Sequence, residues 1–73
     1  MKLPNREQIE RLRREYPVGC KVILRKMSDP QAPPLGTEGE VYGVDSSGSL
    51  LVHWNKGSSL NVLYGIDVAE RVV

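Results

Sequence analysis

Residues 36–57 read GTEGEVYGVDSSGSLLVHWNKG and hold five of the seven glycines in this 73-residue chain. Short apolar runs separate the glycines, and Leu50, Val52 and Trp54 occupy every second position of one run. A period of two is typical of a β-strand that buries one face. Glycine allows sharp backbone turns because it has no Cβ. The segment therefore predicts short strands joined by tight turns.

Three irregular points in this segment can be located from the sequence. Asp45-Ser-Ser-Gly48 is predicted to form a hairpin turn, with glycine where a positive φ is needed. Val41 and Val44 are not an even number of residues apart, which predicts a β-bulge near Gly43. Residues 55–57, Asn-Lys-Gly, are predicted to form a second tight turn that ends in a left-handed glycine.

Strand patterns continue on both sides of this segment. Cys20, Val22 and Leu24 alternate with polar or more exposed positions, residues 60–64 alternate in the same way, and residues 68–73 form a short final run. Residues 27–35, MSDPQAPPL, contain three prolines and are expected to form a stiff loop of partly polyproline geometry. Five short strands with tight turns predict a mainly β, strongly bent barrel.

The alternation also predicts which side chains form the core. These residues are Val22, Leu24, Val41, Val44, Leu50, Val52, Trp54, Leu60 and Val62. An alternative for Trp54 is an aromatic groove shared with Tyr16 and Tyr42, of the kind that binds peptides.

The N-terminal segment changes to a helical period. Asn5 is a favourable N-cap, and Gln8 three residues later completes a variant of the capping box. Pro17 ends the helix, since the residue before a proline is biased away from helical geometry. The sequence therefore predicts one amphipathic helix within residues 1–17.

Ile9, Leu12 and Tyr16 form a narrow apolar stripe on this helix, which Leu3 extends. An isolated helix of this length is marginal in water, so the stripe must dock. Two docking partners remain open: the protein's own barrel, which leaves a monomer, or a second copy, which gives a weak homodimer.

Length and composition exclude several classes of protein. The chain is long enough for one small domain. With one cysteine and one histidine it lacks the residues for an internal disulfide or a usual zinc site. We expect no cofactor. We also expect no membrane span and no secretion signal, because no apolar run is long enough for either. A free cysteine is typical of a cytoplasmic protein.

Charge is unevenly distributed. Residues 1–26 hold eight Lys or Arg against three Glu, a balance of +5, while residues 27–73 hold two against six, a balance of −4. Such asymmetry is typical of an electrostatic interaction surface, although the basic segment can instead fold back on the acidic part. The candidate phosphate contacts are Arg6, Arg13 and Arg14, expected on the helix face opposite the stripe, and Lys21 and Arg25 on the first strand.

No catalytic motif is present in the sequence. His53 is predicted to point outward from its strand, and Cys20 is predicted to be a buried structural thiol rather than half of a nucleophilic pair. We therefore expect no enzymatic activity. The candidate protein contacts are Pro33, Pro34, Leu35, Tyr42 and His53. The proline-rich loop either covers part of the barrel or is presented to a partner.

Several motifs together resemble a known family. They are YPVG at residues 16–19, MSDPQAPPLGTEGEV at 27–41, VDSSG at 44–48, WNKGSSL at 54–60 and GID at 65–67. This pattern is similar to that of small bacterial domains of unknown function, common in Firmicutes and their mobile elements. The resemblance covers roughly Tyr16 to Asp67, with departures at Asn55 and Tyr64.

The resemblance implies an SH3-like barrel over residues 18–73 and no assigned activity. Together with the residue-level reading, it predicts a non-catalytic binding or adaptor module whose partner is an unknown protein. The alternative is a module that binds nucleic acid through the basic N-terminal helix and the first strand.

Overall fold

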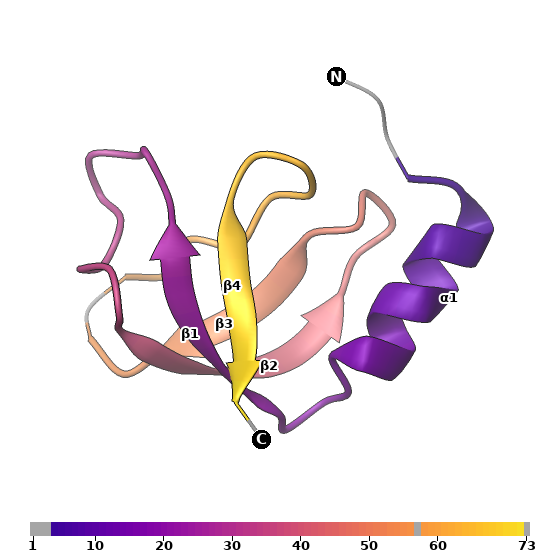
Figure 1. Cartoon of the computed structure of the whole chain (residues 1–73), viewed down its shortest axis with the longest axis horizontal. Helices are drawn as coiled ribbons and strands as arrows, with labels where there is room; N and C mark the ends of the chain where they lie inside the picture. The colour runs from indigo at the N-terminus through magenta and orange to yellow at the C-terminus, as the bar shows by residue number, and fades with distance from the viewer. Residues whose placement is uncertain (1–3, 57, 73) are drawn as a thin grey trace.

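The computed structural model describes residues 4–56 and 58–72. It contains the helix α1 (Arg6–Glu15) and the strands β1 (Lys21–Lys26), β2 (Glu38–Val44), β3 (Leu50–Trp54) and β4 (Val68–Val72). The strands form one antiparallel sheet in the order β3-β2-β1-β4 (Figure 1). The predictions of a mainly β fold and one N-terminal helix are confirmed. The expectations for Leu3 and for a left-handed Gly57 fall outside the described residues.

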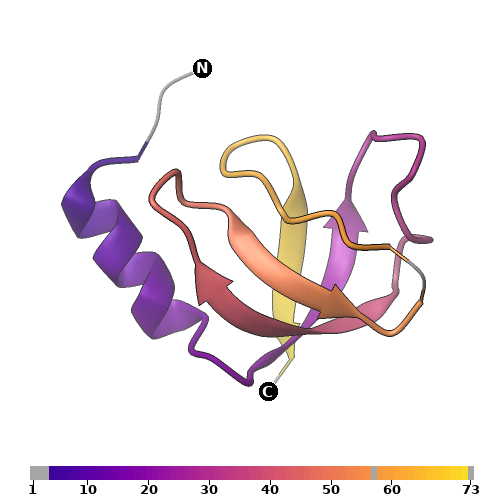
Figure 2. The same cartoon turned by 180° about the vertical axis from the view of Figure 1, so that it is seen from behind.

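The sheet is curled around a single core. β1 and β4 pass in front of β2 and β3 in Figure 1 and behind them in Figure 2, so that one sheet encloses the core from two sides. The buried apolar residues are Val22, Leu24, Val41, Val44, Leu50, Val52, Trp54, Val62 and Ala69. The core prediction, including an inward Trp54, is thus confirmed for all its members except Leu60, which is half-buried.

The prediction of a strand over residues 60–64 is wrong. Only Val62 pairs with the sheet, through an isolated bridge to Leu50 on the edge of β3. The Nε1–H of Trp54 donates to the carbonyl oxygen of Leu60 at 2.8 Å, and this bond occupies a group that a ladder would use. At the C-terminal end of this segment, the chain turns at residues 64–66. Within the described residues, the sheet therefore has four strands and one isolated bridge instead of the five strands that were expected.

Both irregularities predicted for β2 and its hairpin are confirmed. The register between β2 and β3 shifts between Val41 and Gly43, which is the predicted bulge. In the turn that follows, the N–H of Gly48 donates to the carbonyl of Asp45 at 3.0 Å, and Gly48 has a φ of 83°. Asp45 Oδ1 also accepts bonds from the Ser47 and Ser49 N–H groups, which fixes the turn between β2 and β3.

Helix α1 begins with the predicted capping box. The N–H of Gln8 donates to Asn5 Oδ1, and the N–H of Asn5 donates to Gln8 Oε1, both at 2.9 Å. Leu12 and Tyr16 of the apolar stripe pack against the protein's own core, beside β2. No helix within residues 4–56 and 58–72 is long and apolar enough to cross a membrane.

The proline-rich segment between β1 and β2 is folded into two turns. The N–H of Ala32 donates to the carbonyl of Asp29, and the N–H and hydroxyl of Thr37 donate to that of Pro34. The N–H of Gly36 donates to the carbonyl of Leu24 at 2.7 Å, which ties the end of the loop to β1. The segment is thus ordered by its own turns and is attached to β1 at its C-terminal end.

Candidate functional site

The largest hollow described in the molecule is a groove of about 550 Å³ beside the turn that precedes β4. Its apolar lining consists of Met27, Leu60, Leu63 and Ile66. Its polar lining consists of Ser28, Asp29, Ser59, Asn61 and Asp67. We call this set of residues the acidic groove, because it includes two carboxylates and none of its described lining residues is Lys, Arg or His. Its volume lies in the usual range for ligand sites.

Three separate parts of the chain are fixed in place to form the acidic groove. Met27 directly follows β1 and packs against the core. Leu60 is fixed by the bond from the Trp54 indole to its carbonyl. The turn over residues 63–67 is closed by Asp67, whose Oδ2 accepts from the Leu63 N–H at 2.9 Å. The groove is therefore built by groups that the fold already holds.

One polar atom in the groove wall has no partner. Asn61 Oδ1 is shielded from solvent and accepts no hydrogen bond from the described residues. Buried acceptors in native proteins are nearly always paired, and an unpaired one has a considerable desolvation cost.

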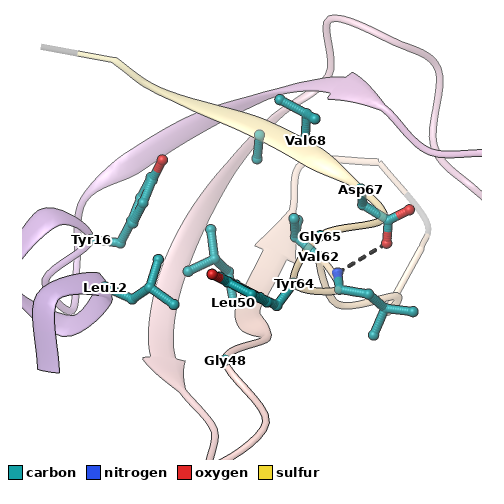
Figure 3. Close-up of a pocket in the computed structure, with 11 residues that line it drawn as sticks. Leu12, Tyr16, Gly48, Leu50, Val62, Tyr64, Gly65, Asp67 and Val68 are labelled. Atoms are coloured by element: carbon teal, nitrogen blue, oxygen red, sulfur yellow. Dashed lines mark hydrogen bonds between the residues drawn. The ribbon is translucent and has the colours of Figure 1, made fainter. Parts of the chain in front are cut away.

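A second, smaller hollow of about 160 Å³ lies between α1 and the sheet (Figure 3). Leu12 and Tyr16 form its helix side, and Leu50 and Tyr64 are among the residues on the other side. Burial, and to a lesser degree the neighbouring Glu15 carboxylate, raises the pKa of the Tyr16 hydroxyl, which therefore stays protonated at neutral pH. The hollow is open to solvent on one side, and its lining mixes apolar side chains with Tyr16, Tyr64 and Asp67.

The turn over residues 63–67 separates the two hollows. Leu63 and Asp67 line both the acidic groove and the cavity beneath α1. The dashed bond in Figure 3 joins these same two residues.

The structure brings together two of the predicted protein contacts. The rings of Tyr42 on β2 and His53 on β3 stack on the outer face of the sheet, with centroids 4.0 Å apart and planes inclined by 22°. Pro33, in contrast, is buried in the loop between β1 and β2, while Pro34 and Leu35 are exposed there. The loop thus buries one proline and presents the following two residues to solvent.

The predicted phosphate contacts on α1 are spread around the helix. Arg6 is paired with Glu10, with Nε 3.4 Å from Oε1, and Arg14 is exposed. The expectation that Arg13 faces away from the apolar stripe is wrong. Its guanidinium reaches the sheet and donates to the carbonyl oxygen of Val44 at 3.1 Å. Arg13 therefore helps to dock the helix.

The predicted phosphate contacts on β1 lie among carboxylates. Arg25 Nε is 2.9 Å from Glu70 Oε2 on the neighbouring strand β4. Lys21 stands directly opposite Glu40 in the pairing of β1 with β2. Acidic side chains thus interrupt the basic residues on this side of the sheet.

Neither of the two residues considered for nucleophilic chemistry has an activated setting. Burial raises the pKa of the Cys20 thiol, although Arg71 partly opposes this effect, so the thiolate is disfavoured at neutral pH. The imidazole of His53 is engaged in the stack with Tyr42. Within residues 4–56 and 58–72 no group of three or more His, Cys, Asp or Glu is placed to hold a metal ion.

Sequence reasoning missed the acidic groove. A signal was present in residues 63–66, LYGI, where two large apolar side chains lie outside the alternating pattern. Leu63 and Ile66 are 43% and 41% exposed, respectively. Apolar residues that break the strand period beside a glycine turn are candidates for a surface site rather than for the core.

Comparison with known proteins gives a family but no characterised relative. No curated protein and no solved structure matches the chain. A family model described as a domain of unknown function matches residues 5–72, which is nearly all of the fold described above. The chain therefore belongs to the family called Domain of unknown function (DUF4314).

Proposed function

We propose that this chain is a non-catalytic binding module whose partner is another protein. The acidic groove carries the proposal, because it is the largest described hollow and its lining combines apolar side chains with fixed hydrogen-bonding groups. That combination is typical of a recognition site. The protonated thiol of Cys20 and the stacked ring of His53 weigh against a catalytic role.

We also propose that the curled sheet is an SH3-like barrel. The strand order β3-β2-β1-β4 and the bridge from Leu50 to Val62 support this assignment, because Val62 lies on the free edge of β3, where a fifth strand would continue the sheet. A cytoplasmic setting is supported by the free thiol of Cys20, and a bacterial origin is supported by the motif resemblance. An association with mobile elements rests on the motif resemblance alone.

Nucleic-acid binding through α1 and β1 is the alternative function. The excess of eight basic residues over three acidic ones in residues 1–26 favours it. The pairing of Arg25 with Glu70 weighs against it, because a carboxylate already occupies that guanidinium, and Lys21 has Glu40 opposite it on the neighbouring strand. Protein binding is therefore the better supported of the two.

The test is affinity capture from the native host with the full-length chain, carried out with and without nuclease treatment. A partner that survives nuclease and then binds the purified chain directly supports the proposal. Fluorescence anisotropy with generic DNA and RNA tests the alternative, since phosphate contacts must weaken as salt rises. Salt-sensitive nucleic-acid binding together with loss of every captured protein on nuclease treatment would overturn the protein-binding proposal.

A further inference from the structure

We propose that the acidic groove binds an extended segment of a partner protein in which a large apolar side chain lies next to lysine or arginine. This inference rests on the proposed protein-binding function and names the site and the chemical class of its ligand. It places recognition in the acidic groove rather than at the stacked pair of Tyr42 and His53.

The apolar part of the ligand follows from the exposed side chains of the groove. Leu63 and Ile66 are 43% and 41% exposed although both are large and apolar, and they lie beside Leu60 and Met27 in one hollow. Exposed apolar side chains gathered around a concavity are typical of an interaction site. Methionine adapts its shape to different partners because its side chain is unbranched and flexible. A partner's apolar side chain placed here would remove these surfaces from water.

The basic part of the ligand follows from charge. Asp29 and Asp67 each use one carboxylate oxygen to accept a backbone N–H, from Gln31 and Leu63 respectively, which fixes how the carboxylates are oriented. An ionised carboxylate has further acceptor capacity beyond one bond. Since no Lys, Arg or His is among the described lining residues, the groove attracts a cation and repels an anion.

An extended peptide can carry both parts of this ligand. Its backbone N–H groups are donors, and lysine and arginine side chains contribute more. Apolar and basic side chains on one extended segment therefore match the apolar wall and the two carboxylates of the groove.

The occupant is inferred to come from another protein rather than from a second copy. The basic part of this chain is its N-terminal segment, but Leu12 and Tyr16 on that segment already pack against the chain's own core. Arg13 is bonded to Val44, which further holds α1 in place. The helix therefore has no free apolar stripe to offer to the groove of a neighbour.

The experiment is selection of a random peptide library displayed on phage against the immobilised full-length protein. Enriched peptides are sequenced, synthesised and titrated into ¹⁵N-labelled protein. We expect enrichment of apolar residues adjacent to Lys or Arg, and chemical-shift changes centred on the groove. Replacing the basic residues of a selected peptide by glutamate is expected to weaken binding about tenfold or more, since glutamate and the carboxylates of the groove carry like charges.

Two variants and one control test the site. Ile66→Ser removes an exposed apolar wall, and Asp29→Lys reverses one carboxylate; each is expected to weaken a selected peptide about tenfold. Val18→Ser is the matched control, because Val18 is 76% exposed and does not line the groove. Trp54 fluorescence verifies that each variant is folded. The shift mapping uses the unmodified protein, so the site remains testable if a variant does not fold.

Three outcomes would overturn the inference. The first is enrichment of acidic or purely polar peptides, or no enrichment at all. The second is mapping of the bound peptides to Tyr42 and His53 or to another surface, in which case protein binding stands and only the groove assignment falls. The third is concentration-dependent self-association that Ile66→Ser abolishes, which would make a second copy the occupant. The nuclease-controlled capture remains the separate test of the proposed function.

Discussion

Gly39, the second residue of β2, provides a sharp test of how the sheet packs. A Cβ added at this position would lie 2.5 Å from Val52 Cγ1, 2.7 Å from Trp54 Cε3 and 3.0 Å from the carbonyl oxygen of His53. All three atoms belong to β3, which pairs directly with this part of β2. The change Gly39→Ala therefore forces β2 and β3 apart or displaces the buried indole.

The expected loss of stability is at the upper end of the range for overpacked cores. Such substitutions typically cost about 1–3 kcal/mol. Here two contacts are with buried side chains and the third is with backbone, so no flexible chain end can move aside. We expect a loss of about 3 kcal/mol, which for a domain of this size lowers Tm by roughly 12–24 °C.

Gly43 on the same strand is the matched control. A Cβ there would meet only Leu51 Cδ1, at 3.3 Å, and this methyl lies at the end of a side chain that can rotate. Neither glycine has a positive φ, so alanine introduces no left-handed strain at either position. Because alanine also restricts the unfolded chain, Gly43→Ala is expected to change stability by less than about 1 kcal/mol in either direction.

Urea denaturation followed by Trp54 fluorescence measures both variants. Gly39→Ala should also change the emission of the folded state, because the added methyl is directed at the indole. Equal stabilities for Gly39→Ala and Gly43→Ala, or a Gly39→Ala protein as stable as the parent, would refute the packing of β2 on β3 described here.

Three further predictions concern single side chains. Burial alone would raise the pKa of Asp45, but hydrogen bonds from Ser47 and from backbone N–H groups outweigh it and hold that pKa below its ordinary value. The ionised Asp45 therefore stabilises the fold above about pH 4, and this stabilisation is lost as pH falls further. The difference in unfolding free energy between the parent and Asp45→Asn should become smaller at low pH. Urea denaturation at pH 7, 5 and 3 measures it. Because burial raises the pKa of Cys20, its thiol should react with Ellman's reagent at pH 8 more slowly in the folded protein than in 6–8 M urea, and equal rates would contradict the burial. Arg13→Ala should destabilise the protein by about 1 kcal/mol, because it removes the bond to the Val44 carbonyl. Arg14→Ala, at an exposed position, should cost less than about 0.5 kcal/mol. Thermal denaturation of both variants measures the difference.

The parts of the fold that were predictable from sequence are those set by neighbouring residues. The alternation of Leu50, Val52 and Trp54 specifies which face of β3 is buried, and the pair Asn5 and Gln8 specifies where α1 begins. Both signals act over a few residues of chain. Each signal specifies the local backbone geometry, and the folded protein retains that geometry.

The parts that were missed depend on contacts between distant residues. The alternating pattern continues through Leu60, but the Leu60 carbonyl accepts a bond from the Trp54 indole and only Val62 pairs with β3. Arg13 lies on a helix rich in basic residues, and its sequence neighbours do not predict that its guanidinium donates to the Val44 carbonyl on the sheet. The acidic groove is formed by residues 27–29 and residues within 59–67, and no pattern in either segment predicts that the two lie side by side. Pairings of this kind arise only when the sheet curls.

The turn over residues 63–67 is shared by two hollows. Leu63 and Asp67 line both the acidic groove and the cavity beneath α1, so a ligand that displaced this turn would also change the shape of that cavity. If such a ligand changed the free energy with which α1 docks, linkage would require helix docking to change ligand affinity by the same factor. Substitutions in α1 would then alter recognition without any contact between the helix and the ligand.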